Sequence, residues 1–493
     1  MSIESFHIEE ATIEGIHSAM REGMITTRQL VGTYMAGIEA YDKKGPAINS
    51  VISINPNALE EAAELDRKFR EAGLIGPLHG IPVLLKDNIE TKNMPTTGGS
   101  LSMQGYQPAD DAPMVRRFRE AGAIILAKAN LHEFALWGET VSSLLGQTLN
   151  PYDLTRTPGG SSGGTGAAVA SNFGAVGVGT DTVNSIRSPA SACSLVGIRP
   201  TLGLITRSGI ISYSPTQDTA GPITRTVSDA ARMLDIMAGY DPDDPATDAS
   251  VGNIPDTYTS FLVKDGLKGA RIGVLQSFFG SGAEHKEVNE VTLKAVDTMK
   301  REGAEILLLD VLLDADKILA EVSVNLYELR EALNVYLQSA QPQAPVRSLE
   351  DIIASGKYHP GIKDNVLKAI GLSTRDIEYH ERMDRRLRLQ ETYLKIMTDK
   401  RLDAMVFPHQ KRLVAPVGQP QAERNGVLTA VTGFPSVVVP AGFSGPTESA
   451  PIGVPIGMEF VGRPWTESLL IRLAYAFEQA SLVRRPPSGA PAL

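Results

Sequence analysis

The most unusual segment of the sequence is a run of glycine and hydroxyl residues at 159–166, which leads directly into the alanine-rich stretch 167–170. A loop with so few side chains lets backbone approach another group closely, and here it opens a helix. It is not a phosphate-binding loop, because that loop needs lysine and then serine or threonine after its last glycine. A purely structural glycine turn stays open as an interpretation of these residues alone.

The same run contains the pattern G-x-S-x-G at residues 160–164, which is typical of the nucleophile elbow of α/β-hydrolases and would make Ser162 the nucleophile. An elbow follows a buried strand, whereas residues 150–158 contain two prolines, an aspartate and an arginine. His409, after the apolar run 404–407, would be the histidine of such a triad. The elbow therefore stays a secondary hypothesis.

A second serine, Ser185, lies in a predicted turn between a strand and a helix. Residues 175–181 are typical of a strand, and Ser188 before Pro189 is a favourable helix start, because proline at the first helical position lacks only an N–H that would be unpaired. Backbone N–H groups in such a turn can converge beside the hydroxyl, as an oxyanion hole requires. The residue type alone does not separate this role from that of a turn or cap serine.

A lysine, Lys86, ends the apolar run 81–85. Its side chain either extends to solvent or is held inside for chemistry. Burial would lower its pKa from about 10.4 towards about 7 to 8. Serine hydroxyls would supply the hydrogen-bond partners that a buried amine needs. The neighbouring Asp87 would oppose the shift, but successive side chains of a strand point to opposite faces.

Together, and in this order, these segments resemble the amidase signature family. The matching motifs are a lysine that ends G-I-P-V-x-x-K-D, the run G-G-S-S-G-G, and G-T-D-x-x-x-S-I-R-x-P-A, with Ser185 placed 24 positions after Ser161. Further matches at 197–203, 217–222 and 453–462 extend the resemblance over about residues 65–479.

The resemblance implies a Ser-cisSer-Lys triad formed by Ser185, Ser161 and Lys86. Ser185 would attack the carbonyl carbon, and its proton would pass through Ser161 to neutral Lys86 before the relay protonates the leaving amine. The peptide bond before Ser161 would be cis. The implied oxyanion donors are the backbone N–H groups of Thr182, Val183, Asn184 and Ser185. Substrate contacts are assigned to Gly159 and Gly160.

One departure from the family pattern concerns the oxyanion turn. The family usually has Gly-Gly before the nucleophile, and this chain has Val183 and Asn184. Asparagine tolerates unusual backbone angles, whereas β-branched valine does not. Catalysis would survive if the backbone path survives, and the Asn184 side chain would add a further hydrogen-bond donor.

Around these motifs the sequence predicts an α/β protein. The resemblance implies the amidase signature fold, a mixed central β-sheet flanked by helices on both faces. We expect a helical N-terminal cap at 1–72, a catalytic core at 73–483 with a helical insertion at about 314–401, and a flexible tail at 484–493. Strands are predicted at 81–85, 123–127, 175–178, 196–198, 267–275, 305–309, 404–407, 436–439 and 455–461, and further helices at 284–301 and 466–482.

Composition narrows the classes of function. The net charge of −10 disfavours nucleic acid and anionic membrane surfaces. The single cysteine, Cys193, allows no internal disulfide, and neither a signal peptide nor a membrane-spanning run is recognised, so a cytoplasmic location is expected. His132-Glu133 lacks the second histidine of H-E-x-x-H. We therefore expect no metal and no cofactor, and the oligomeric state stays open, with a homodimer among the options.

The predicted function is hydrolysis of a carbon–nitrogen amide bond in a small-molecule or peptide-like substrate, through an acyl-enzyme on Ser185. Two alternatives stay open. A carbamate (urethane) or aryl ester hydrolase would use the same triad. The A-type subunit of a glutamine-dependent amidotransferase would instead need partner subunits and a route for ammonia.

Overall fold

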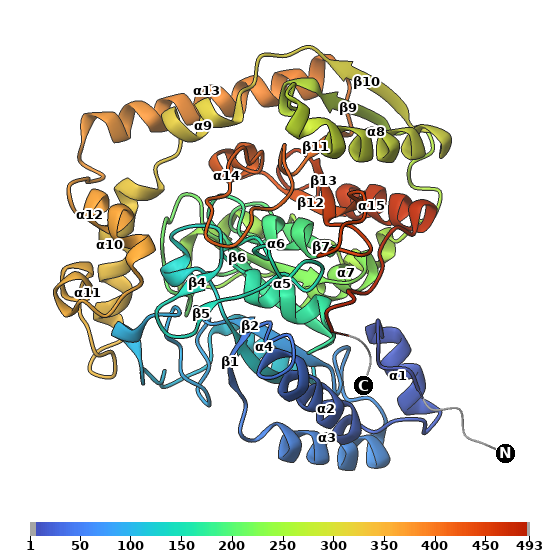
Figure 1. The fold of residues 1–493 in the computed structure, drawn as a ribbon, viewed down its shortest axis with the longest axis vertical. Coiled ribbons are helices and arrows are strands. Elements are labelled where there is room, and N and C mark those ends of the chain that lie inside the picture. The colour runs from blue at the N-terminus through green and yellow to red at the C-terminus, as the bar shows by residue number, and fades with distance from the viewer. Residues whose placement is uncertain (1–5, 491–493) are drawn as a thin grey trace.

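The polypeptide folds around one mixed β-sheet. In the computed structural model, which describes residues 6–490, eleven strands pair edge to edge (Figure 1). In chain order they are β1 (Val51–Ile54), β2 (Pro82–Lys86), β3 (Ile124–Ala129), β6 (Val176–Asp181), β7 (Val196–Arg199), β8 (Thr219–Thr224), β9 (Arg271–Leu275), β10 (Glu305–Leu309), β11 (Ala404–Pro408), β12 (Ser436–Phe443) and β13 (Pro455–Val461). A separate hairpin consists of β4 (Val141–Ser142) and β5 (Gly146–Gln147).

The strand order explains how distant motifs meet. Across the sheet the strands run β1-β3-β2-β6-β8-β7-β12-β13-β11-β9-β10. β2 is parallel to both β3 and β6, so the carboxyl ends of β2 and β6 lie at the same edge of the sheet. β6, β8, β7, β12, β13 and β11 then pair antiparallel, and β11, β9 and β10 pair parallel. The sheet is therefore mixed, as predicted.

Helices flank this sheet. They are α4 (Pro113–Glu120), α5 (Gly163–Ala170), α6 (Arg187–Ala192), α7 (Val227–Met237), α8 (Lys286–Arg301), α14 (Val427–Thr432) and α15 (Glu467–Ser481). α5 packs on β2 and β6. Its small residues allow a very close approach, because a Cβ added at Gly177 of β6 would lie 2.4 Å from Cγ2 of Thr165. The start of α5 is thereby held against the strands that carry the other motifs.

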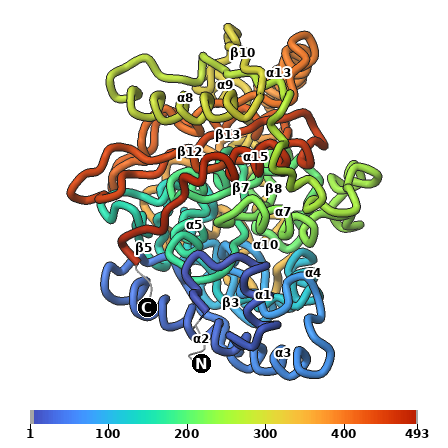
Figure 2. The backbone as a smooth tube through the Cα atoms, turned by 90° about the vertical axis from the view of Figure 1, so that its right-hand side faces the viewer, coloured from blue at the N-terminus to red at the C-terminus, as the bar shows by residue number. Residues whose placement is uncertain are grey.

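The N-terminal segment is not purely helical. It contains α1 (Ile13–Arg21), α2 (Thr27–Gly37) and α3 (Ala58–Ala72), which lie at one end of the molecule in Figure 2. Thr26 caps α2 by accepting a hydrogen bond from the N–H of Gln29. Between α2 and α3, however, β1 joins the edge of the main sheet by pairing antiparallel with β3. The helical cap predicted for 1–72 thus contributes a strand to the core.

The segment predicted as a helical insertion, 314–401, lies between β10 and β11. It contains α9 (Ala315–Glu321), α10 (Asn325–Ser339), α11 (Leu349–Ser355), α12 (Lys363–Ile370) and α13 (Ile377–Asp399). Glu328 of α10 fastens it to the core, because its carboxylate accepts hydrogen bonds from the hydroxyls of Ser214 and Thr216. In Figure 1, α10, α11 and α12 lie at the left of the molecule, and α9 and α13 lie across its top.

The C-terminal segment is anchored, in contrast to the flexible tail predicted for 484–493. The Arg484 guanidinium binds the Glu10 carboxylate with two hydrogen bonds of 2.6 and 2.7 Å. The Tyr152 hydroxyl donates to the carbonyl oxygen of Arg485 at 2.6 Å. Residues 484–490 are therefore fixed to the body, and the last part of the predicted tail, 491–493, lies outside the described residues.

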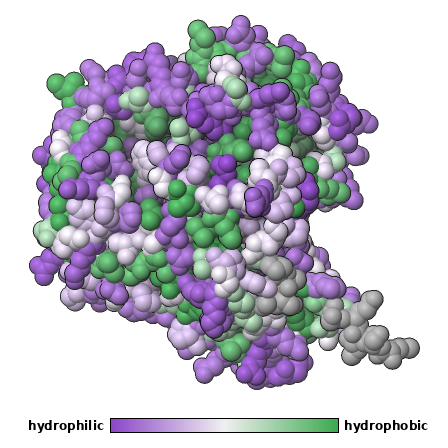
Figure 3. All heavy atoms as spheres, in the orientation of Figure 1, coloured by the Kyte–Doolittle hydropathy of each residue, from purple (hydrophilic) through white to green (hydrophobic). Residues whose placement is uncertain are grey.

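The surface mixes polar and apolar side chains. On the face shown in Figure 3, hydrophilic and hydrophobic residues are interspersed. Within residues 6–490, a bilayer-crossing helix is not found, since the long helices carry too many polar residues.

Candidate active site

Lys86 ends β2 and is fully buried. Its Nζ lies 2.7 Å from Oγ of Ser161, 2.8 Å from Oγ1 of Thr180 and 3.4 Å from the carbonyl oxygen of Thr180. Burial lowers the pKa of Lys86 to about 7, although the carboxylates of Asp181 and Asp218 act in the opposite direction. The amine is thus in contact with hydroxyl and carbonyl oxygens and can be neutral near pH 7.

Asp87 points away from Lys86. Its carboxylate lies 3.2 Å from Nζ of Lys128 on β3 and accepts a hydrogen bond from the N–H of Thr97. The alternation of side chains along a strand therefore places this charge on the other face, as the sequence predicts.

The glycine-rich loop brings Ser161 to Lys86. The peptide bond between Gly160 and Ser161 is cis, as the family resemblance implies. Gly159 has φ = 71° and its Cα lies against Ser188, since an added Cβ would be 2.8 Å from Oγ of Ser188. A Cβ at Gly160 would meet Oγ1 of Thr140 at 2.7 Å. A side chain at either position would collide with the neighbouring residues, so the loop needs glycine at both.

The same packing bears on the substrate contacts predicted for Gly159 and Gly160. Both residues are buried, and a cavity of about 600 Å³ above the Ser185 turn is lined, as far as residues 6–490 define it, by neither of them. Direct substrate contacts from Gly159 and Gly160 therefore stay a prediction.

Ser162 does not have the environment of a nucleophile elbow. It is fully buried, its hydroxyl donates to the carbonyl oxygen of Thr180 at 3.2 Å, and it also accepts from the N–H of Thr180 at 3.3 Å. His409 bonds through Nδ1 to Oε1 of Glu459 at 2.6 Å. Because Ser162 is tied to the strand and His409 to a carboxylate, the structure does not assemble the elbow triad.

Ser185 lies in the turn between β6 and α6. The helix begins at Arg187, two residues before Pro189, and not at the predicted start. The turn is tied by Asp181, whose carboxylate accepts from the N–H of Ile186 at 3.1 Å, and by Arg187, whose Nη2 donates to the carbonyl oxygen of Val183 at 2.6 Å. The backbone path of the turn is therefore fixed by buried polar contacts.

The backbone N–H groups of this turn are unpaired in the part of the chain that the structure describes. Within residues 6–490, the N–H groups of Thr182, Val183, Asn184 and Ser185 are donated to no protein acceptor. Val183 and Asn184 both avoid positive φ, so the side chains that replace the usual glycines fit this path without strain. Free backbone donors next to a serine hydroxyl are what an oxyanion hole requires.

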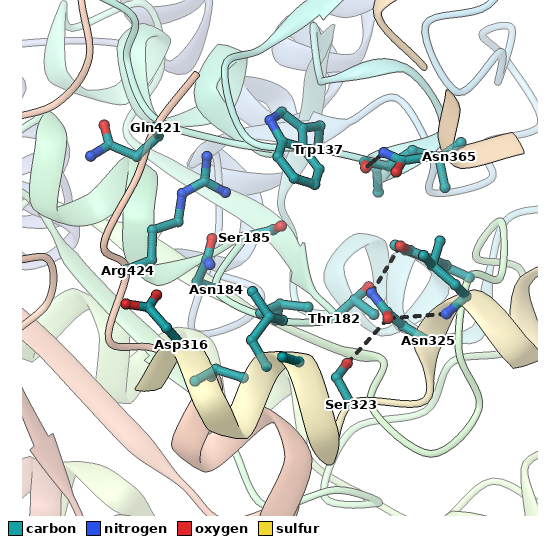
Figure 4. Close-up of a pocket in the computed structure, with 18 of the residues that line it drawn as sticks. Trp137, Thr182, Asn184, Ser185, Asp316, Ser323, Asn325, Asn365, Gln421 and Arg424 are labelled. Carbon is teal, nitrogen blue, oxygen red and sulfur yellow. Dashed lines mark hydrogen bonds between the residues drawn. The ribbon is translucent and has the colours of Figure 1, made fainter. Parts of the chain in front are cut away.

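A cavity of about 600 Å³ opens above this turn (Figure 4). Its floor contains Ser185, which is 7% exposed, and its walls come from the segment after β3, from the insertion and from the segment before α14. The polar and aromatic lining includes Trp137, Thr182, Asn184, Tyr213, Asp316, Ser323, Asn325, Asn365, Gln421 and Arg424. The volume is within the range of pockets for small molecules.

The two serine segments lie side by side, but their hydroxyls are not joined. The N–H of Ser162 donates to the carbonyl oxygen of Ser185 at 3.2 Å. In the described part of the chain, no hydrogen bond links Oγ of Ser161 with Oγ of Ser185. The structure thus brings Lys86, Ser161 and the Ser185 turn together, but the hydroxyls of Ser161 and Ser185 are not in hydrogen-bond contact.

Sequence reasoning missed two groups of residues. Thr180 contacts Lys86 directly, and Nδ2 of Asn88 donates to Oγ1 of Thr180 at 3.0 Å. Thr180 belongs to the G-T-D motif at residues 179–181, so its position next to the site could have been predicted from that motif. The cavity-wall residues Trp137, Asp316 and Arg424 come from segments with no recognisable motif, so only the fold reveals them.

Comparison with known proteins agrees with this fold. A family model described as Amidase matches residues 29–471, and the chain belongs to this family, the amidase signature family. A probable amidase of Arabidopsis thaliana is 37% identical, over 98% of this chain and 92% of its own length. The A-type subunit of the glutamyl-tRNA(Gln) amidotransferase of Thermoanaerobacter pseudethanolicus is 31% identical, over 97% of this chain and 98% of its own length.

Solved structures of related proteins have the same fold. The native peptide amidase from Stenotrophomonas maltophilia matches with a TM-score of 0.89 at 37% identity, over 99% of this chain and 100% of that one. An amidase family protein from Bacillus anthracis matches with a TM-score of 0.85 at 33% identity, over 98% and 93% of the two chains.

Proposed function

We propose that the protein hydrolyses a carbon–nitrogen amide bond through an acyl-enzyme on Ser185, with Ser161 and Lys86 as the proton relay. The observation that carries this proposal is the contact of 2.7 Å between Nζ of Lys86 and Oγ of Ser161, at the foot of a turn whose N–H groups are unpaired within residues 6–490. The similarity to a peptide amidase favours a peptide-like substrate.

In the proposed reaction, Ser185 Oγ attacks the carbonyl carbon and gives its proton to Ser161, which passes its own proton to neutral Lys86. The oxyanion is stabilised by the N–H groups of residues 182–185. The proton returns along the same path to the leaving nitrogen, and the C–N bond breaks. Water then attacks the acyl-enzyme, which releases the acid and restores Ser185.

The open contact between the two serines is compatible with this path. Catalytic hydrogen bonds are often long before substrate binds and shorten in the substrate complex. A carbonyl group held by the oxyanion donors would place the acyl carbon against Oγ of Ser185 and exclude water from the gap. The missing contact is then formed when the relay is needed.

The test is labelling with an organofluorophosphonate, followed by mass mapping of the modified serine. We expect the adduct on Ser185 and none after Ser185→Ala. An adduct on Ser162, or full amidase activity of Ser185→Ala, would reject the assignment.

The two alternatives make different predictions. A carbamate or aryl ester hydrolase would use the same residues, and rates on a matched amide, carbamate and ester series would identify the preferred leaving group. A component of an amidotransferase, to which the 31% identity points, would be inert on simple amides when purified alone. Amide hydrolysis by the isolated chain would exclude that role.

A further inference from the structure

Three asparagines line the large cavity, and they differ in how their amides are paired. Nδ2 of Asn325 donates to the hydroxyl of Tyr213 at 2.8 Å, and Nδ2 of Asn365 donates to the carbonyl oxygen of Leu136 at 2.9 Å. Asn184 is only 4% exposed, yet within residues 6–490 its side-chain amide makes no hydrogen bond (Figure 4). Its amide atoms are not among the fully enclosed unpaired groups of these residues, so they open onto the cavity and are available to a molecule there.

The backbone and Cβ of Asn184 are closely packed. A Cβ added at Gly426 would lie 2.9 Å from Cβ of Asn184, so the backbone of residue 426 packs directly behind it. The carbonyl oxygen of Asn184 accepts from the N–H of Ser188 at 2.7 Å, which fixes its backbone. The backbone and Cβ of Asn184 are therefore fixed before any ligand binds, which limits the entropy that binding would cost.

The charges around Asn184 are compensated or of both signs. Arg424 lies on the same side of the cavity in Figure 4, but its Nη2 is 3.0 Å from Oε1 of Glu139, so its charge is already compensated. Asp316 and Lys368 are exposed charged residues of the same cavity, and within residues 6–490 neither forms an ion pair. The lining therefore offers one unpaired charge of each sign, whereas Asn184 itself offers a neutral donor and a neutral acceptor.

The cavity faces the acyl part of the substrate. The leaving nitrogen must approach Ser161, because it takes its proton from the relay. Ser161 and Lys86 are fully buried and do not line the cavity, whereas Ser185 and Asn184 do. Side chains of the cavity wall therefore contact the group that stays on Ser185.

We propose that the side-chain amide of Asn184 is a subsite for an amide group in the acyl part, next to the scissile bond. Nδ2 of Asn184 donates to the carbonyl oxygen of this group, and Oδ1 accepts from its N–H. The substrate class is then peptide amides and amides of N-acylated amino acids, in preference to simple alkyl or arylalkyl amides. This inference rests on the proposed function and narrows its substrate.

The test compares two primary amides, N-acetyl-phenylalaninamide and 3-phenylpropanamide, which differ in the acetamido group. The readout is the ratio of their kcat/KM values, because a general loss of activity cancels in the ratio. We expect the native protein to favour the acetamido compound by about tenfold or more, and Asn184→Ala to lower the ratio by about tenfold, the size expected for lost hydrogen bonds to a buried partner.

Two further variants sharpen the test. Asn184→Asp keeps the size and the acceptor oxygens but removes the donor, and it should also lower the ratio. Asn365→Ala removes another cavity asparagine, whose amide is bound to Leu136, and should leave the ratio within about twofold of the native value. Thermal melting of each variant identifies any that fails to fold.

The outcomes separate this inference from the proposed function. A native ratio near one, or a ratio that both Asn184 variants leave unchanged, would overturn the subsite while Ser185-dependent hydrolysis stands. Absence of hydrolysis of either compound by the native protein, together with no fluorophosphonate adduct on Ser185, would reject the function itself.

Discussion

Two lysines of this protein are equally buried and lie on neighbouring strands, yet they meet different partners. Lys86 ends β2 and contacts the hydroxyls of Ser161 and Thr180. Lys128 lies on β3, where Nζ is 3.2 Å from Oδ1 of Asp87 and 2.7 Å from Oγ1 of Thr96. Among the described residues, no carboxylate contacts the first amine, whereas the second forms an ion pair.

The difference shows that the partner, and not burial, decides what a buried lysine can do. Burial lowers the pKa of both amines, and at Lys128 the adjacent carboxylate of Asp87 opposes this effect directly. An ion pair holds the proton on Lys128 and ties β3 to the loop that follows β2. Hydroxyl partners leave Lys86 able to lose its proton and accept another, which suits a relay.

The largest effect is expected for Lys86→Met. Without the amine, no group accepts the proton from Ser161, so turnover of a primary amide should fall by about 10⁴-fold. The protein should stay folded, because the substitution removes a buried amine whose charged form is costly in this site. Steady-state rates and thermal melting check both statements. Turnover within tenfold of the native value would contradict the role of Lys86.

Lys128→Met should have the opposite profile. It leaves the Asp87 carboxylate buried without its cation, which costs about 3–5 kcal/mol of unfolding free energy. Turnover per folded molecule should change little, because Lys128 does not contact the relay. Urea unfolding measures the loss, and the double variant Asp87→Asn with Lys128→Met should recover part of it. A stable Lys128→Met protein without turnover would contradict the structural role of Lys128 and indicate a catalytic one.

The pH dependence should report Lys86 and not Lys128. The relay needs the neutral amine, and the pKa of Lys86 is about 7, so kcat/KM should be level above that pH and fall about tenfold per unit below it. A substrate without ionisable groups is used, so that only the protein titrates. A level profile from pH 8 down to pH 5 would show that no group with this pKa controls the reaction.

The smallest effect concerns the second partner of Lys86. Thr180→Val removes an acceptor that stabilises the ammonium form more than the amine, so the acid limb should move to lower pH by less than about one unit. Turnover at the plateau should fall several-fold, because Nζ loses the contact that orients it. The measurement is the pH profile of kcat/KM.

Two variants control this test. Thr180→Ser keeps the hydroxyl and should restore the native acid limb. Thr165→Val removes another buried hydroxyl, which donates to the carbonyl oxygen of Val178 on the same strand and does not touch Lys86. An equal shift of the limb in Thr165→Val would mean that the effect is general and does not pass through Thr180.

Most of the sheet could be predicted from apolar runs between glycines. The strands predicted at 305–309 and 455–461 match β10 and β13 in their bounds. β1 and β8 were missed, because β1 is a four-residue edge strand between helices and β8 contains a glycine and a proline. Such strands are defined by their neighbours in the sheet and carry little pattern of their own.

The site was predictable as far as motifs extend. The motifs around Lys86, the glycine-rich run and Ser185 identified three segments that the fold brings together. Whether Lys86 meets Thr180, and whether the Asn184 amide is free, depends on packing between segments far apart in sequence, which no local pattern encodes.

The link between Glu10 and Arg484 makes two residues that are 474 positions apart in the sequence neighbours in space. Because residues 10 and 484 are in contact, the helices and strands between them could be connected in a different order and still form the same fold. A linker could join the segments on either side of this contact, and new termini could be opened in the exposed turn at residues 251–253. A circularly permuted protein of this kind should keep Lys86, Ser161 and Ser185 in register, because all three lie on the same side of the new opening.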